Sequence, residues 1–251
     1  MKKFIDTHCH IFKEYYDDIP FLMSQLDDNL EFIINNAVDI TTIKEVLEAS
    51  DKYFNMYCAI GIHPEYVDSY KEEDIEYIIN NLHRKNVLAI GEIGLDYHYE
   101  LDNKDAQLDL FNKQLKIAQE YNMPVIIHSR DATMDTINTL KKYKLRGIIH
   151  SFSGSYETAK EYIKMGFYLG INGVVTFKNA KLIEVIKRIG IDKCVLETDS
   201  PYLTPVPFRG QQNSPKNIEL IIKFLASNLE VDEDTIIDIT NANVKQIFSQ
   251  K

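Results

Sequence analysis

The stretch Ile5-Asp6-Thr7-His8-Cys9-His10 follows a short apolar start and has the composition of a first β-strand that ends in polar residues. Side chains alternate between the two faces of a strand, so Asp6, His8 and His10 are expected to point the same way. Two imidazoles one strand step apart, with a carboxylate beneath them, form half of a metal site. A pair of ordinary structural histidines has the same spacing, so the rest of the chain has to decide between the two interpretations.

Apolar, β-branched runs alternate with amphipathic helical patterns along the chain. Several runs are continuous in Val, Ile and Leu, as is typical of parallel strands that are covered on both faces. The expected strands are Lys3–Thr7, Glu31–Ala37, Met56–Ile62, Val87–Ile93, Pro124–His128, Gly147–Ser151, Gly166–Ile171 and Lys193–Thr198. The expected helices are Thr41–Lys52, Glu72–Arg84, Asp105–Tyr121, Thr133–Tyr143, Tyr156–Met165, Ala180–Ile189, Pro215–Asn228 and Glu233–Phe248.

Eight such strands in 251 residues predict an α/β protein with a (β/α)₈ TIM barrel. The two closing helices are expected to cap the last strand. No linker rich in Gly, Ser or Pro and no internal repeat divides the sequence, so we expect residues 1–251 to form a single domain.

The composition excludes several classes of protein. Hydrophobic residues make up 45% and charged residues 26%, which is ordinary for a globular protein and argues against long disorder. No apolar run approaches the roughly 20 residues that cross a bilayer, and the start of the chain lacks a signal-peptide pattern. The three cysteines have no paired spacing, which indicates reduced thiols in a cytoplasmic protein.

The formal net charge of −10 argues against binding nucleic acid through bulk electrostatic attraction. It leaves open an enzyme that handles a phosphodiester through a few local arginines and metal ions. No feature of the sequence indicates an obligate protein partner.

Potential metal ligands end many of the apolar runs. In a barrel such residues lie at the carboxyl ends of the strands, the face where barrel active sites are built. Any one of them has a structural explanation, but buried ionisable groups are costly unless they are paired or bound to metal. The six candidate ligands are His8, His10, Glu92, His128, His150 and Asp199.

Four imidazoles and two carboxylates suit Zn²⁺, Mn²⁺, Ni²⁺ or Co²⁺, and the carboxylates with water also tolerate Mg²⁺. Six ligands exceed what one catalytic zinc takes from protein, because such a site keeps an open position. Two divalent metal ions roughly 3.5–4 Å apart, sharing a bridging carboxylate, accommodate all six.

Residues beside these ligands are candidates for substrate contacts. Arg130 follows His128, and Arg209 lies in a loop after the last strand; guanidinium groups beside paired metals suit a phosphate. Solvated loop arginines are the alternative. Tyr97 and Tyr202 could stack on bases or sugars. His83 is interpreted as structural, and the role of His98 stays open.

With these motifs the chain resembles the TatD family of metal-dependent hydrolases, described as deoxyribonucleases within the amidohydrolase-like barrels. The resemblance implies one metal on His8, His10 and Asp199, a second on His128 and His150, and Glu92 bridging them. It also places His63, Arg130 and Arg209 toward the substrate. Phe12 departs from the family, which often has a carboxylate or amide there. The matching motifs are Asp-Thr-His-Cys-His at 6–10, Gly-Ile-His-Pro at 61–64, Gly-Glu-Ile-Gly-Leu-Asp-Tyr at 91–97, Ile-His-Ser-Arg at 127–130, His-Ser-Phe-Ser-Gly at 150–154, Leu-Glu-Thr-Asp-Ser-Pro-Tyr-Leu at 196–203 and Pro-Val-Pro-Phe-Arg-Gly at 205–210.

The leading hypothesis is a metal-dependent phosphodiesterase that acts on DNA at strand ends or on single strands. Asp199 and Glu92 are the candidate catalytic residues: Asp199 as proton acceptor for the attacking water, Glu92 as the bridge between the metals. Glu197 is expected to support the barrel interior. The alternatives are hydrolysis of an ester or amide, including the aminoacyl ester of a tRNA, and a non-catalytic, metal-stabilised partner protein.

Overall fold

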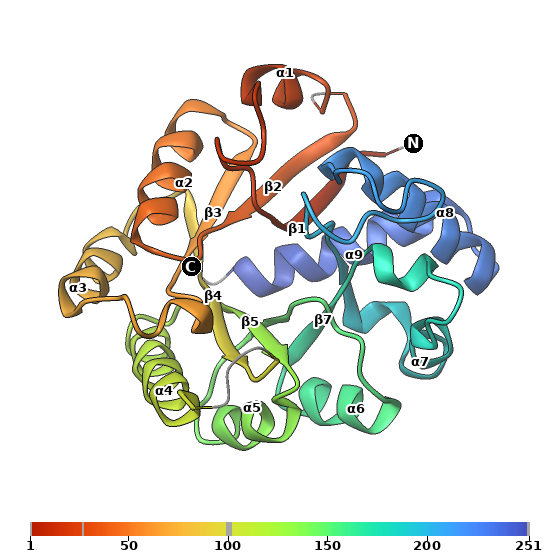
Figure 1. Cartoon of the computed structure of the whole chain (residues 1–251). Coiled ribbons are helices and arrows are strands. Elements are labelled where there is room, and N and C mark those ends of the chain that lie inside the picture. The colour runs from red at the N-terminus through yellow and green to blue at the C-terminus, as the bar shows by residue number, and fades with distance from the viewer. Residues whose placement is uncertain (1, 27, 99–101, 250–251) are drawn as a thin grey trace.

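A computed structural model describes residues 2–26, 28–98 and 102–249, and it contains one parallel sheet whose eight strands follow the order of the chain (Figure 1). The prediction of an α/β barrel is confirmed. The strands are β1 (Phe4–Cys9), β2 (Leu30–Asn36), β3 (Met56–Ile60), β4 (Val87–Asp96), β5 (Val125–Arg130), β6 (Gly147–Ile149), β7 (Phe167–Ile171) and β8 (Cys194–Leu196).

Helices surround this ring of strands (Figure 1). The α-helices are α1 (Ile19–Ser24), α2 (Ile40–Lys52), α3 (Glu72–Asn81), α4 (Lys104–Glu120), α5 (Thr133–Leu140), α6 (Tyr156–Lys164), α7 (Leu182–Ile189), α8 (Ile218–Leu229) and α9 (Glu233–Phe248). Short 3₁₀ turns are η1 (Pro64–Tyr66), η2 (Gly173–Thr176), η3 (Ile191–Lys193) and η4 (Pro215–Asn217). The sequence did not predict α1, because six residues are too few to show a helical period.

The interior of the barrel is apolar at the end where the strands begin. One buried residue from each of seven strands belongs to a single cluster, which can form only inside the ring: Ile5, Ile34, Ala59, Ala89, Ile126, Ile148 and Val195. Val244 and Ile247 of α9 pack into the same cluster. Figure 1 shows α9 lying across the ring of strands. This helix therefore closes the amino-terminal end of the barrel, and its expected role as a cap on the last strand alone was too narrow.

The barrel closes between β1 and the segment after β8 through backbone and side-chain hydrogen bonds. The backbone bridge there joins Cys9 to Ser200. The Thr7 hydroxyl donates to the Leu196 carbonyl at 3.0 Å. The Asp6 carboxylate accepts the Thr198 hydroxyl at 2.6 Å and the Thr198 backbone N–H at 3.0 Å.

Asp6 therefore joins β1 to the segment after β8 by hydrogen bonds, and it does not lie beneath the two imidazoles as a metal ligand. The expected alternation fails here because the pairing register shifts between Asp6 and Cys9. Ile5 consequently points into the barrel at one end, while His8 and His10 point into its mouth at the other. A shift of one residue moves every later side chain to the opposite face, which explains how both sets can point inward.

Two further expectations concern membrane spanning and the cysteines. Within the described part of the chain, no helix combines the length and apolar character needed to cross a membrane. Cys9, Cys58 and Cys194 are buried free thiols.

Candidate metal centre

The six candidate ligands converge at the carboxyl end of the barrel. His8 lies in β1, Glu92 in β4 and His128 in β5. His10 and His150 follow directly after β1 and β6, and Asp199 lies three residues after the end of β8. The site faces a cavity of about 630 Å³. Five of the six residues are buried, and the His128 side chain is 17% exposed.

One group of ligand atoms surrounds Glu92 Oε2. His8 Nε2 lies 3.2 Å and His10 Nε2 3.5 Å from this oxygen. The two imidazole nitrogens are 3.1 Å apart. Asp199 Oδ1 lies 3.7 Å from His8 Nε2 and 3.5 Å from His10 Nε2. Atoms bound to one divalent ion at 2.0–2.2 Å lie about 3–3.6 Å from one another, so this group fits a single ion.

A second group faces the other oxygen of the same carboxylate. His128 Nδ1 lies 2.8 Å and His150 Nε2 3.6 Å from Glu92 Oε1. His150 Nε2 is also 3.7 Å from Asp199 Oδ1. Glu92 therefore presents one oxygen to His8 and His10 and the other to His128 and His150. The ligand atoms of His63, Glu92 and His128 also lie within 4.8 Å of one another.

The far side of three of these imidazoles faces an acceptor. His128 Nε2 contacts Asp96 Oδ2 at 2.9 Å, and His150 Nδ1 contacts Glu197 Oε1 at 3.0 Å. His10 Nδ1 contacts the carbonyl oxygen of Asn36 at 2.9 Å. Metal-binding histidines characteristically use their second nitrogen in this way, because the acceptor fixes the ring and raises its basicity. The donor set therefore fits divalent metal ions.

Asp96 and Glu197 contact candidate ligands, and the sequence did not predict these contacts. Asp96 lies four residues after Glu92, and β4 continues to it instead of ending at Ile93 as expected. Residues four apart on a strand share a face, and this spacing could have revealed Asp96. Glu197 is buried as expected for the barrel interior, but its carboxylate also lies beneath His150. Gly170 leaves space for it, because a Cβ there would lie 2.1 Å from Glu197 Oε2.

The imidazoles and carboxylates of the site shift one another's pKa values. Burial alone would favour neutral Glu92, but His8 and His150 outweigh it and hold the pKa of this carboxyl well below its usual range. Burial also opposes charge on the imidazoles. The carboxylates nevertheless raise the pKa of His128 to about 9, through Asp96 and Glu92, and that of His150 to about 10, through Glu197 and Glu92. Without metal, both imidazoles therefore carry a proton where a cation would bind.

The residues predicted to face the substrate lie at different distances from this centre. His63 and Arg130 line the cavity, whereas Arg209 does not belong to its lining. The Arg209 guanidinium lies 4.3 Å from the centre of the Phe177 ring. His63 Nε2 lies 3.9 Å from Glu92 Oε1, while its Nδ1 accepts the backbone N–H of Glu65 at 3.3 Å.

The two tyrosines considered for stacking have different environments. Tyr202 lines the cavity and is 49% exposed. Tyr97 is buried, its hydroxyl donates to Asp135 at 3.0 Å, and it does not line the cavity, so its burial does not support stacking on a substrate. His98 pairs with Asp131 at 2.8 Å, and His83 lies just after α3; neither lines the cavity.

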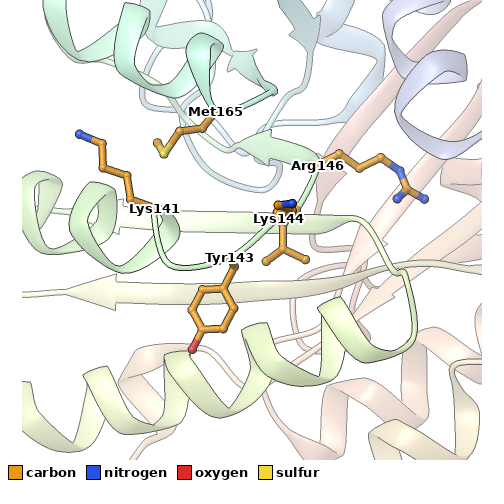
Figure 2. Close-up of a pocket in the computed structure, with 6 residues that line it drawn as sticks. Lys141, Tyr143, Lys144, Arg146 and Met165 are labelled. Carbon is orange, nitrogen blue, oxygen red and sulfur yellow. The ribbon is translucent and has the colours of Figure 1, made fainter.

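A second depression lies between α5, β6 and α6, away from the metal ligands (Figure 2). Lys141 and Arg146 contribute to its lining, but Figure 2 shows that their side chains diverge. Lys141 pairs with Glu161 at 2.7 Å, and Arg146 Nε donates to the Ile247 carbonyl at 2.9 Å. Arg146 therefore helps to hold α9 in place, and this depression lacks the convergent groups of an anion site.

Comparisons with known proteins agree with this geometry. A family model described as TatD related DNase matches residues 5–249. The uncharacterized metal-dependent hydrolase YabD of Bacillus subtilis is 41% identical over 249 residues, covering 97% of this chain and 98% of the relative. The uncharacterized metal-dependent hydrolase YcfH of Escherichia coli is 30% identical over 254 residues, covering 97% of this chain and 95% of the relative.

Solved structures show the same architecture. The crystal structure of YjjV, a TatD homolog from Escherichia coli K12, matches with a TM-score of 0.87 and 29% identity, covering 98% of both chains. A mutant PTE-like lactonase from Deinococcus radiodurans shares the fold, with a TM-score of 0.67 and 13% identity over 98% of this chain and 95% of that one.

Metal binding should release protons, because a cation has to displace those on His128 and His150. The raised pKa values of these groups mean that apparent metal affinity increases as pH rises from 6 to 8, by up to about tenfold per unit for each proton displaced. Calorimetric titration of metal-free protein with Mn²⁺, in buffers of different ionisation enthalpy, counts the protons. Affinity that is independent of pH over this range would contradict the charge assignment.

Asp96→Asn and Glu197→Gln should each weaken metal binding at the His128–His150 pair by about 10- to 100-fold, because a neutral amide supports an imidazole less well than a carboxylate. The His8–His10 pair should keep its affinity. Asp135→Asn is the matched control, since it removes a carboxylate that contacts only Tyr97 among the groups described here. Calorimetry measures the two affinities, and a melting curve monitors folding. Unchanged affinity in both variants would refute the supporting role of these carboxylates.

Proposed function

The chain belongs to the TatD related DNase family and is a metal-dependent hydrolase, and we propose that it hydrolyses phosphodiester bonds of DNA, at strand ends or in single strands, with two divalent metal ions. The observation that supports this most strongly is Glu92, whose two oxygens face two separate pairs of histidines. Paired metals held in this way are a recurrent solution for phosphodiester hydrolysis.

In this proposal His8, His10 and Asp199 would hold one ion, His128 and His150 would hold the other, and Glu92 would contribute a ligand to both. Mg²⁺, Mn²⁺ and Zn²⁺ are the candidates for the ions. Bound there, they would lower the pKa of water and neutralise charge that develops on the phosphate.

Asp199 is the proposed proton acceptor for the attacking water. Burial favours its neutral form, but His150 and His10 outweigh this effect and lower the pKa of the carboxyl. The carboxylate is thus ionised and can take a proton at neutral pH, then pass it to the leaving oxygen. Its position is fixed, because the Asp199 backbone N–H donates to the His8 carbonyl at 2.8 Å.

His63 is the proposed hydrogen-bond donor to the substrate. Its Nδ1 accepts the Glu65 N–H, so the neutral ring carries its proton on Nε2, the atom nearer to Glu92. Burial and the charge of His128 lower the pKa of His63 to about 3, which keeps the ring neutral. His63 forms a group of possible metal ligands with Glu92 and His128, and the proton on Nε2 favours a substrate contact there over a seventh ligand.

Arg130 is the proposed phosphate contact, because it is exposed at the end of β5 and lines the cavity. Arg209 lies over Phe177 beyond the lining and would contact a phosphate farther along a strand. The buried position of the ligands favours an entering strand end over a continuous duplex. The three buried free thiols support a cytoplasmic location.

Hydrolysis of an ester or amide on the same site is the second candidate, including the aminoacyl ester of a tRNA. Glu65 supports it: this half-exposed carboxylate lines the cavity 3.6 Å from His63 and would suit the ammonium group of an aminoacyl ester.

A substrate screen distinguishes the two candidates. Purified protein with Mg²⁺, Mn²⁺ or Zn²⁺ is expected to degrade labelled single-stranded DNA and to leave aminoacyl-tRNA esters intact. Duplex with blunt, blocked ends should resist, because the ligands lie inside a narrow mouth. Deacylation without DNA cleavage would establish the second candidate, and inactivity on every substrate with every metal would refute both.

Asp199→Asn should lower kcat at least about a hundredfold, since it keeps the size and one oxygen of the side chain but removes the base. Metal should still bind at the His128–His150 pair. Steady-state rates at saturating metal, with Asp135→Asn as control, measure the effect. If the variant turns over like the parent, another residue must be the proton acceptor.

A further inference from the structure

Four aromatic rings form a closed circuit on one side of the cavity. The His10 and Phe12 ring centres are 5.6 Å apart, and those of Phe12 and Tyr15 are 5.8 Å apart. Tyr15 and Tyr202 are separated by 5.8 Å, and Tyr202 returns to His10 at 6.3 Å. We call Phe12, Tyr15 and Tyr202 the aromatic wall. It begins at a metal ligand and extends outward from it.

The aromatic wall is built to expose its outer rings. Phe12 is 2% exposed and supports the others from within, while Tyr15 is partly exposed and Tyr202 is half-exposed. All three line the cavity. The space in front of them adjoins the metal ligands, so a group placed there would belong to a substrate whose reacting bond lies at the metal centre.

The wall is also held rigidly. The loop after β1 and the loop after β8 are joined by the Tyr16 hydroxyl, which donates to the Asn213 carbonyl at 2.9 Å. Asn213 Nδ2 in turn donates to the Tyr202 carbonyl at 2.6 Å. A preorganised surface loses little conformational entropy when a ligand stacks on it.

The opposite side of the cavity is polar. Ser129 and Arg130 come from β5, and Ser151 follows β6; all three line the cavity. Strands β1 and β8 adjoin at the seam, whereas β5 lies four strands from β1 in the ring. The cavity thus has an aromatic side and a polar side that carries the Arg130 guanidinium, with the candidate metal ligands between them.

We propose that the aromatic wall is a nucleobase subsite, in which a base next to the scissile phosphate stacks on Tyr202 and Tyr15. The proposal rests on the proposed function and names its substrate as a nucleotide chain whose base and phosphate lie on opposite sides of the cavity. A planar apolar group joined to an anion by a short linker matches this division, and a nucleotide has that form.

The subsite should accept any base. Phe12 offers no hydrogen bond, and the Tyr202 hydroxyl already donates to the Tyr15 hydroxyl at 2.9 Å. Recognition therefore depends on ring faces, which every base has, and sequence preference should be weak.

The test compares a single-stranded oligothymidylate with the same chain carrying an abasic residue at the scissile position. For the parent, removing the base should reduce kcat/KM by about 5- to 150-fold, the range for loss of one stacked base. Tyr202→Ala should reduce kcat/KM on the normal strand by a similar factor, and the two losses should not multiply. Tyr202→Phe should retain most of the rate, because the ring faces remain.

Tyr121→Ala is the matched control, since Tyr121 is an exposed tyrosine just after α4 and does not line the cavity. It should behave like the parent. Equal hydrolysis of normal and abasic strands by the parent would overturn the base subsite while leaving the nuclease intact. If the loss from removing the base and the loss from Tyr202→Ala multiply when the two changes are combined, the base subsite would be overturned too.

If the parent hydrolyses neither strand, the proposed function fails, and binding then decides the subsite. Calorimetry on the metal-loaded protein compares thymidine 5′-monophosphate with deoxyribose 5-phosphate. Tighter binding of the nucleotide by at least about fivefold, lost in Tyr202→Ala and kept in Tyr121→Ala, supports the subsite. Equal affinity for the two compounds overturns it.

Discussion

The burial of one carboxylate, Glu92, among four imidazoles is the constraint on which the rest of the site depends. A buried carboxylate is costly unless positive charge or hydrogen bonds surround it. Here its two oxygens face different histidine pairs, at 3.2 and 3.5 Å on one side and 2.8 and 3.6 Å on the other. The arrangement is therefore stable either with protonated imidazoles or with cations in place of those protons. Metal binding exchanges one kind of positive charge for the other within a fixed geometry.

The barrel separates stability from chemistry along its axis. At the amino-terminal end, apolar residues from seven strands pack against Val244 and Ile247 of α9. At the carboxyl end, imidazoles and carboxylates fill the interior and contact one another, while His8 Nδ1 and Glu197 Oε2 have no hydrogen-bond partner among the described residues. Where β1 meets the segment after β8, beside the site, Asp6 joins the two by accepting two hydrogen bonds from Thr198, the residue directly before Asp199. The position of Asp199 thus depends on the closure of the barrel as well as on its own loop.

The sequence predicted the parts of this design that are local. A histidine or carboxylate that ends a β-branched run is visible without a structure, and barrel topology then brings such residues to one mouth. The parts that depend on long-range packing were missed. They include the register shift after Asp6, the closure of the barrel by α9, and the pairing of Asp96 and Glu197 with ligands on other strands. The burial of Tyr97 also depends on long-range packing, because its contact with Asp135 involves a helix more than thirty residues away.

The most direct test of a binuclear site is anomalous scattering from crystals of the protein loaded with excess Mn²⁺. The account predicts two peaks per chain, one on each side of Glu92, separated by roughly 3.5–4 Å. One peak should lie beside the Nε2 atoms of His8 and His10, the other beside His128 and His150. A single peak under saturating metal, or two peaks of which neither contacts Glu92, would contradict it.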